Sequence, residues 1–421
     1  MILIIASIAL FTFAKSLTPA SNLLYNFDRF LDIKKFEHVS FGEINEGQCT
    51  LKEFTKNLPA NTYNVTDHNI TTDHGYILQM FRVRLNNTAL ANLSKNDQEN
   101  ISRPVLIQHG LFDDATSMIQ NLNTTFSFYM LNKGFDVWFG NNRGNKFSLD
   151  NTNSKIDDED FYDYSFTEMG LTGVPAFYKE ILLSYPEDPS KKIIYFGHSE
   201  GTSQMFAALS DPISKTYVRA HTERFFALSP IAYMTQITTE ALSWVSNIEQ
   251  TIDFAANVLH VWQIGGLNCD DESPQWAALA YQMCKRIAFL CDRSDLSLGD
   301  LSDDGASVKQ LAHYAQLIKG GDNGVPVFRP YDYGTNENMD VYGQPTPPEW
   351  DFSDWTTPTN LVIGEEDPLG TPANVDVLIG KLPKTLDLTS NIIPGWAHST
   401  CLKPDDDTPL IDIINKALNL Q

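Results

Sequence analysis

Short apolar runs separated by segments with helical spacing make up most of the chain from Tyr63 onward. The runs are rich in β-branched and aromatic residues, which favours buried strands, whereas Val174–Ser184 and Thr202–Ser210 repeat apolar residues at helical spacing. Strands that alternate with helices predict an α/β fold, with a mostly parallel sheet covered on both faces. The predicted strands are Tyr76–Val83, Val105–Gln108, Phe135–Phe139, Ile193–Phe196, Phe225–Leu228, Leu361–Ile363 and Leu386–Ile393.

The strand pattern stops between Pro230 and about Gly320, where apolar residues fall at loosely helical spacing. We interpret this stretch as a helical insertion in the α/β unit. The predicted organisation is a first core segment at residues 46–229, the helical insertion at 230–345 and a second core segment at 346–421.

The chain begins with an apolar run, Ile2–Ala14, that ends at Lys15. The run is far shorter than the roughly 20 residues of a membrane-spanning helix, and small residues near its end suit a cleavage site. We interpret residues 1–14 as a secretory signal peptide, with a buried N-terminal strand or helix as the alternative. Residues 15–45 are left as a propeptide or an N-terminal helix. No transmembrane span is expected, and the predicted location is the lysosomal lumen or the cell exterior.

Cysteines and Asn-x-Ser/Thr sequons fit a secretory route and predict a glycoprotein with disulfide bonds. The five cysteines are an odd number, so at least one is free or paired between chains. Cys284 and Cys291 are predicted to pair because they are close in sequence within one helical segment, and the pairing of Cys49, Cys269 and Cys401 stays open. The six sequons lie at Asn64, Asn69, Asn86, Asn92, Asn100 and Asn123.

The net negative charge of the chain excludes one class of binding partner. The chain has 30 basic and 53 acidic residues, hence a net charge of −23, and this field repels phosphate backbones, so no nucleic acid is expected as a partner. The acidic clusters Asp157–Asp160 and Asp405–Asp407 are interpreted as solvated faces, and neither a metal site nor a cofactor is expected. With 42% hydrophobic and 20% charged residues, the composition is that of a globular protein.

The segment Gly197-His198-Ser199-Glu200-Gly201 fits the pattern G-x-S-x-G. The predicted strand Ile193–Phe196 stands immediately before it, and a helical segment follows. A sharp strand-to-helix turn favours glycine on both sides, because a Cβ there would collide with the neighbouring strand and helix. Such a turn presents the Ser199 hydroxyl at a helix N-terminus, where partial positive charge favours an alkoxide-like transition state. An ordinary glycine-rich turn is the alternative.

A serine nucleophile needs a base, and the base needs an orienting carboxylate. His398 is the expected base because it follows the last predicted strand and its turn. Asp367 is the expected carboxylate, with Glu366 as the alternative, because both follow the strand Leu361–Ile363. The other histidines after the serine, which adjoin a strand start or the insertion, are His221, His260 and His313.

Two backbone N–H groups are predicted to form an oxyanion hole. One belongs to Glu200, directly after the nucleophile, and the other to the turn His109-Gly110-Leu111 that follows Val105–Gln108. His109 is interpreted as structural rather than as a base, because it precedes the nucleophile and lies on the oxyanion side.

Together these motifs resemble those of the acid lipases, the family that includes gastric and lysosomal acid lipase. The resemblance runs from about Asn64 to the C-terminus, and its blocks stand in family order. It implies an α/β-hydrolase core with an inserted helical cap, or lid, and hydrolysis of neutral lipid esters at a lipid–water interface. The matching blocks are Asp73–Leu78, Gln108–Leu111, Gly134–Trp138, Gly140–Asn145, Tyr164–Met169 and the G-x-S-x-G segment.

The resemblance also assigns roles to single residues. It implies Ser199 as nucleophile, Asp367 as acid and His398 as base. It implies the N–H groups of Leu111 and Glu200 as the oxyanion hole. The segment with Cys284 and Cys291 matches the family's cap disulfide with a shorter spacing. We expect a monomer without cofactor that acts on triacylglycerol or sterol ester.

The chain departs from the family at two positions near the site. The family has glutamine after the nucleophile, whereas here Glu200 places a potential anion beside the oxyanion. Our hypothesis is that the Glu200 side chain points away or is protonated at the working pH. The aspartate that the family has shortly after its histidine is absent, because Ser399-Thr400-Cys401 follows His398. The alternative functions are a soluble carboxylesterase for small esters and a catalytically silent lipid-binding protein of this fold.

Overall fold

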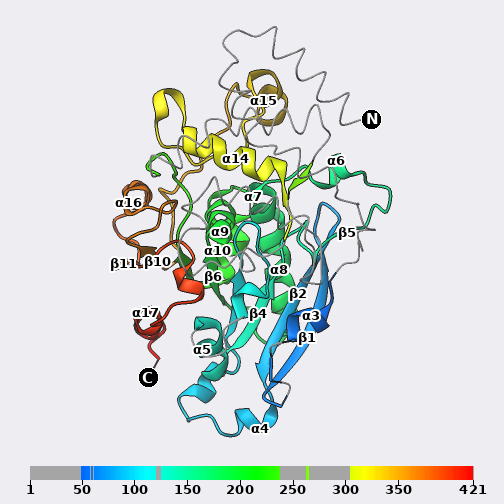
Figure 1. Ribbon diagram of the computed structural model, residues 1–421, viewed down its shortest axis with the longest axis vertical. Helices are drawn as coiled ribbons and strands as arrows, with labels where there is room; N and C mark the ends of the chain where they lie inside the picture. Colours follow the sequence, from blue (N-terminus) through cyan, green and yellow to red (C-terminus); the bar gives the residue numbers. More distant parts are fainter. Residues whose placement is uncertain are drawn as a thin grey trace, which may run out of the picture.

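Figure 1 shows the computed structural model, in which one large sheet lies between two layers of helices. The predicted signal peptide, the segment at residues 15–45 and much of the predicted cap lie outside the described residues. The structure describes residues 49–56, 58–59, 61–119, 125–237, 262–264 and 304–420.

The sheet follows the order β1-β2-β4-β3-β6-β7-β10-β11, with β5 paired to one end of β2. Every pairing from β4 to β11 is parallel, whereas β1, β2 and β5 form an antiparallel edge. The predicted mostly parallel sheet and its seven predicted strands are therefore confirmed. The strands are β1 (Tyr63–Thr71), β2 (Tyr76–Leu85), β3 (Pro104–Gln108), β4 (Asp136–Gly140), β5 (Asp150–Asn151), β6 (Ile193–His198), β7 (Thr222–Leu228), β10 (Thr359–Gly364) and β11 (Leu388–Ile393).

The central strands are apolar on both faces because helices cover both faces. In β6, Ile193 and Tyr195 belong to one buried cluster, whereas Ile194 and Phe196 belong to the other. The alternation follows from the two-residue period of a strand, and burial on both sides explains the continuous apolar run in the sequence. The edge strand β11 is partly exposed, and its sequence is more polar than that of the central strands.

Helices on the two faces contribute to different buried clusters. Side chains of α8, α9, α10 and α16 belong to one buried cluster. Side chains of α3, α5 and α17 belong to the other. The predicted helices at Val174–Ser184 and Thr202–Ser210 are confirmed as α8 and α9. The bounds are α3 (Leu51–Thr55), α4 (Asn87–Leu90), α5 (Phe126–Asn132), α6 (Asp158–Phe161), α7 (Phe166–Glu168), α8 (Val174–Leu183), α9 (Glu200–Ser210), α10 (Lys215–His221), α14 (Val308–Lys319), α15 (Thr335–Tyr342), α16 (Pro372–Lys381) and α17 (Thr408–Leu418).

Two features of the fold were not predicted from the sequence. Strand β1 is mostly exposed and polar because it lies at the sheet edge, so it carries no apolar run. A short ladder, β8 (Gln263–Ile264) with β9 (Ala306–Ser307), lies within the stretch expected to be only helical. Each of these strands has two residues, which is too short to show a two-residue period in the sequence.

The described part of the predicted cap includes α14 and α15, which Figure 1 shows at one end of the molecule, with α14 (yellow) above α9. Helix α14 begins with a capping box, in which Ser307 and Gln310 exchange side-chain-to-backbone hydrogen bonds. The boundaries at residues 230 and 345 stay a prediction. Within the described ranges, no helix is long and apolar enough to cross a membrane.

The described cysteines and sequons differ in accessibility. Cys401 is a free, buried thiol, and Cys49 is disulfide-bonded, whereas Cys269, Cys284 and Cys291 lie outside the described residues. Asn100 is buried and its amide donates to the carbonyl oxygen of Lys133 at 3.0 Å, which makes it unsuited to carry a glycan. The sequon residues that are exposed are Asn64, Asn69 and Asn92.

Candidate active site

Ser199 stands in a sharp turn between β6 and α9, with φ +50° and ψ −115°. This backbone conformation is rare for a residue with a side chain and is typical of functional sites. A Cβ on Gly197 would lie 2.6 Å from the carbonyl of Gly201, and one on Gly201 would lie 2.5 Å from the carbonyl oxygen of Gln108. The prediction that collisions exclude side chains on both sides of the serine is confirmed.

The structure brings Ser199, His398 and Asp367 together from three separate strand ends. The Ser199 Oγ lies 2.8 Å from His398 Nε2, and His398 Nδ1 lies 2.8 Å from Asp367 Oδ2. Ser199 follows β6, Asp367 follows β10 and His398 follows β11, so parallel strands deliver all three to the same edge of the sheet. Glu366, the alternative acid, is exposed.

Asp367 is buried but held in its ionised form. Its Oδ1 accepts hydrogen bonds from the N–H groups of Leu369 at 2.9 Å and Gly370 at 2.8 Å. Burial acts to raise the pKa of Asp367, but the charge and hydrogen bond of His398 and the two N–H donors outweigh it and lower the pKa below its usual value. This carboxylate can therefore fix the His398 ring with Nε2 facing the serine.

The backbone of His398 is supported by two residues that sequence reasoning did not identify. Its carbonyl oxygen accepts hydrogen bonds from His198 Nε2 at 3.0 Å and from Ser229 Oγ at 2.6 Å. Burial lowers the pKa of His198 to about 3, which keeps its ring neutral. These contacts provide local support in a chain that lacks the family's aspartate after the histidine.

The turn after β3 passes directly beside the serine. A Cβ on Gly110 would lie 3.2 Å from Ser199 Cβ, so Leu111 and its N–H are adjacent to the nucleophile position. The N–H of Glu200 belongs to the first turn of α9, where no acceptor exists inside the helix. His109 is buried, its Nδ1 donates to the Gly110 carbonyl at 2.8 Å, and burial lowers its pKa to about 4, which fits the structural role predicted for it.

The other described histidines that follow Ser199 in the sequence have hydrogen-bond partners elsewhere. His221 contacts the carbonyl oxygen of Tyr217 at 2.8 Å on its own helix. His313 is buried between Ser165 Oγ and the carbonyl oxygen of Arg329. His260 lies outside the described residues.

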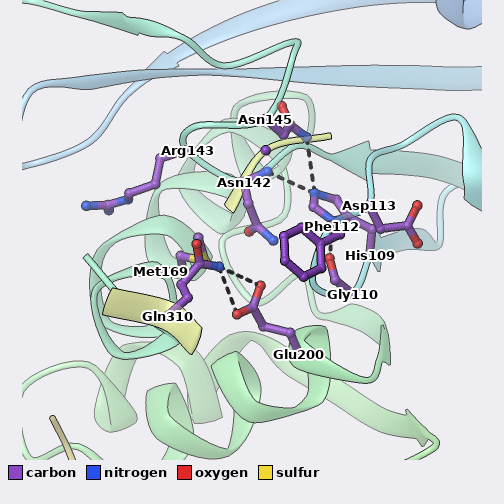
Figure 2. A pocket seen from close by; sticks show the side chains of 11 residues that line it. His109, Gly110, Phe112, Asp113, Asn142, Arg143, Asn145, Met169, Glu200 and Gln310 are labelled. Carbon is purple, nitrogen blue, oxygen red and sulfur yellow. Dashed lines mark hydrogen bonds between the residues drawn. The ribbon is translucent and has the colours of Figure 1, made fainter. Parts of the chain in front are cut away.

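A small pocket opens beside the turn that follows β3, and Glu200 lines it together with Gln310 and Asn142 (Figure 2). Both carboxyl oxygens of Glu200 face Gln310 Nε2, at 2.9 and 3.1 Å. Burial raises the pKa of Glu200 to about 7, although the hydrogen bonds from Gln310 and Tyr314 act in the opposite direction. The side chain is therefore directed at α14, and burial favours its protonated form.

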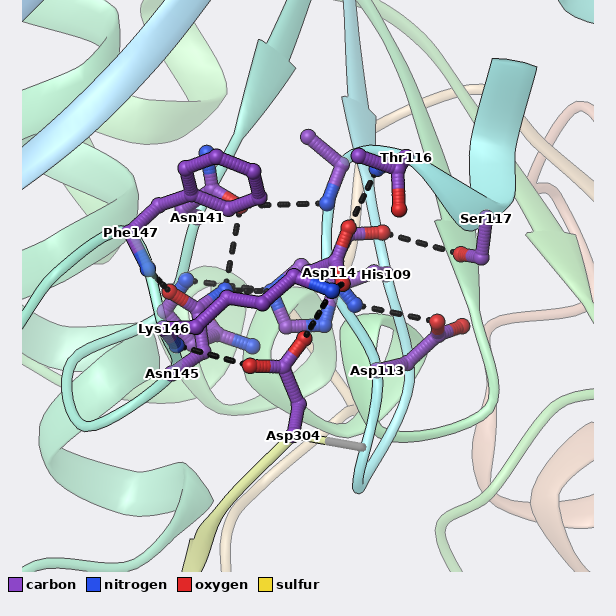
Figure 3. A network of polar contacts seen from close by, with 12 residues as sticks. His109, Asp113, Asp114, Thr116, Ser117, Asn141, Asn145, Lys146, Phe147 and Asp304 are labelled. Carbon is purple, nitrogen blue, oxygen red and sulfur yellow. Dashed lines mark hydrogen bonds and ion pairs between the residues drawn. The ribbon is translucent and has the colours of Figure 1, made fainter. Parts of the chain in front are cut away.

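A buried cluster of Asp114, Lys146 and Asp304 lies near His109 (Figure 3). Lys146 Nζ lies 2.8 Å from Asp114 Oδ2 and 3.7 Å from Asp304 Oδ2, and the N–H of Lys146 donates to Asp304 Oδ1. Burial and the charge of Asp114 raise the pKa of Asp304, whereas a hydrogen bond from Asp304 and the charge of Lys146 hold the pKa of Asp114 low against burial. One carboxyl of the pair thus keeps a proton. Among the described residues, no group of three His, Cys, Asp or Glu side chains is arranged to hold a metal ion.

The parallel sheet and the strained serine turn at a strand end define the fold as an α/β-hydrolase. A family model described as a partial alpha/beta-hydrolase lipase region matches residues 57–122. The chain is 31% identical to gastric triacylglycerol lipase of Rattus norvegicus over 342 residues, which cover 77% of this chain and 81% of that protein.

Two further relatives are also lipases. Lipase lipl-5 of Caenorhabditis elegans is 30% identical over 360 residues, which cover 79% of this chain and 83% of that protein. Lipase member M of Mus musculus is 28% identical over 355 residues, which cover 80% and 78%. The chain therefore belongs to the acid lipase family of α/β-hydrolases, and it is a carboxylic ester hydrolase.

Proposed function

We propose that this protein hydrolyses neutral lipid esters, triacylglycerol or sterol ester, through an acyl-enzyme on Ser199. The observation that carries the proposal is the continuous chain of short contacts from Ser199 Oγ through the His398 ring to Asp367. Nucleophile, base and orienting carboxylate are the three groups that serine hydrolysis requires, in the geometry that it requires.

In the first half-reaction, Ser199 Oγ attacks the ester carbonyl carbon while His398 Nε2 takes the hydroxyl proton. Asp367 accepts the His398 Nδ1–H bond and stabilises the imidazolium that forms. The carbonyl oxygen becomes an oxyanion, which the N–H groups of Leu111 and Glu200 would bind; one such donor is typically worth about 10²–10³ in kcat. The bond to the alcohol then breaks, and His398 returns its proton to the leaving alkoxide.

In the second half-reaction, water replaces the alcohol. His398 Nε2 removes a proton from the water as its oxygen attacks the acyl carbon, and the same proton then goes to Ser199 Oγ as the ester bond breaks. The products are the free alcohol and a fatty acid, and no further reactant is needed.

The lipid substrate is supported by the names of the relatives, which are triacylglycerol lipases and lipases, and by the predicted cap over the site. We further propose that the protein works as a monomer in the lysosomal lumen or outside the cell. The apolar run Ile2–Ala14, the exposed sequons and the disulfide-bonded Cys49 support this location.

The test is hydrolysis of emulsified trioleoylglycerol and of dissolved p-nitrophenyl butyrate from pH 4 to 8, with Ser199→Ala measured in parallel. We expect turnover of the emulsion that the variant abolishes, with the variant folded by circular dichroism. Activity on the dissolved ester alone would replace the lipase with a soluble carboxylesterase. Activity on neither substrate, in a folded protein, would indicate a silent lipid-binding protein.

A further inference from the structure

We propose that the protonation state of Glu200 sets the alkaline limit of ester hydrolysis, a regulation of the site that rests on the proposed function. With its carboxyl protonated, Glu200 offers the oxyanion an N–H donor and no opposing charge. With its carboxyl ionised, the same residue places a buried negative charge beside the negative charge that develops on the substrate.

The surroundings of Glu200 hold its carboxyl in one place. Gln310 directs its Nε2 at both oxygens, and the orientation of this amide is fixed because Gln310 Oε1 accepts the N–H of Ser307 at 2.7 Å. The capping box at the start of α14 therefore determines which end of the amide faces Glu200. The side chain of Glu200 is 1% exposed, so water does not solvate its charge.

In the part of the chain that the structure describes, no cation pairs with this carboxyl. Among the ion pairs of the described residues, none includes Glu200. Arg143 lines the same pocket, but Figure 2 shows its guanidinium directed away from Glu200, and its Nη2 donates to Thr172 Oγ1 at 2.5 Å while the group packs over the Tyr76 ring. An ionised Glu200 would therefore be a buried charge without a counter-charge, which proteins avoid by protonation.

Several titratable groups surround Glu200, and their charges bear on the proposed pH dependence. His109 is neutral because burial lowers its pKa to about 4, and Arg143 keeps its charge but points away. Asp113 lines the same pocket, and burial raises its pKa to about 7, so it is the competing carboxyl. The remaining groups that face Glu200 or the serine are Tyr164, Tyr195, Tyr314 and His398.

The experiment is the pH profile of kcat/KM from pH 5 to 8.5 on p-nitrophenyl butyrate, for the wild type, Glu200→Gln and Asp113→Asn. We expect the wild type to lose at least about tenfold in kcat/KM between pH 6 and 8, because like charges in a buried site repel strongly. Glu200→Gln is expected to lose the alkaline fall, so that its kcat/KM at pH 8 equals its own value at pH 6. Asp113→Asn is expected to retain the wild-type fall.

A substitution of the residue that contacts Glu200 tests the direction of the shift. Gln310→Leu removes a donor to the ionised carboxyl and is expected to move the alkaline midpoint of kcat/KM to higher pH. A purely structural role of Gln310 would leave this midpoint unchanged. Thermal unfolding of each variant identifies any that fail to fold.

The results separate this proposal from the proposed function. A wild-type fall that persists in Glu200→Gln, or that disappears in Asp113→Asn, would overturn the role of Glu200 while leaving the serine mechanism intact. The same holds for a wild type with no alkaline fall. Residual activity in Ser199→Ala equal to that of the wild type would instead overturn the proposed function.

Discussion

Asp367 and Glu200 are two buried carboxyls near Ser199, and their environments shift their pKa values in opposite directions. The oxygens of Asp367 meet His398 and two backbone N–H groups, which lower its pKa. Those of Glu200 meet two neutral donors, the Gln310 amide and the Tyr314 hydroxyl, and burial raises its pKa to about 7. The comparison teaches that burial alone does not decide the charge of a carboxyl, because the number and charge of its donors do.

The largest effect is expected for Asp367→Asn. The asparagine amide has no negative charge to stabilise an imidazolium, and its NH₂ group favours the wrong tautomer of His398, so kcat should fall by about 10⁴. The matched control is Glu366→Gln, which removes the exposed neighbouring carboxyl and should leave kcat unchanged. Steady-state kinetics on p-nitrophenyl butyrate measure both. A loss of less than tenfold in Asp367→Asn would contradict the role of Asp367 as the orienting carboxylate.

The Asp114–Asp304 pair combines one lowered and one raised carboxyl pKa. Lys146 is the cation that the two carboxyls share. Lys146→Met should lower the free energy of unfolding by about 3–5 kcal/mol at pH 7, since it leaves a buried carboxylate without its partner. Urea unfolding followed by tryptophan fluorescence measures the change. Lys179→Met, which removes a largely exposed pair with Asp73, should cost no more than about 1 kcal/mol. Equal losses in the two variants would show that the cluster adds no stability.

A smaller effect is expected in the pH dependence of stability. The pKa of Glu200 is raised in the folded state. Its contribution to the free energy of unfolding is therefore fully present below pH 4.5, the ordinary pKa, and is lost as the pH rises to about 7. Glu200→Gln should remove that loss, which amounts to at most about 3 kcal/mol. Asp367 has the opposite sign, because its lowered pKa gives stability that is lost as the pH falls. Urea unfolding of Glu200→Gln at pH 4.5, 6 and 8 tests the sign, and a wild-type slope in the variant would refute it.

The fold could be predicted from the sequence where burial of an element produces a run or a period of apolar residues. Strands such as β6 are apolar on both faces and were predicted, whereas β1 is polar at the sheet edge and was not. The two-residue strands β8 and β9 are too short for any period. Helix and strand patterns therefore report burial, and they fail where an element is exposed or very short.

The candidate site was predicted in part for a similar reason. Ser199, Asp367 and His398 each follow a predicted strand, and parallel strands end at the same edge of the sheet. The support of the His398 carbonyl by Ser229 comes from a residue that matches no motif. The pairing of Asp304 with Lys146 joins positions 158 residues apart, and only the folded chain places them together.

The central claim is that Ser199 forms the covalent intermediate. The most direct measurement is intact and peptide mass spectrometry after reaction with a hexyl p-nitrophenyl phosphonate, which acylation-competent serines attack with loss of p-nitrophenol. We predict one phosphonyl group per chain, carried by the peptide that contains Ser199, with parallel loss of ester hydrolysis and no label on Ser199→Ala. Labelling of a different residue, or full hydrolytic activity in a protein whose Ser199 stays unlabelled, would contradict the account.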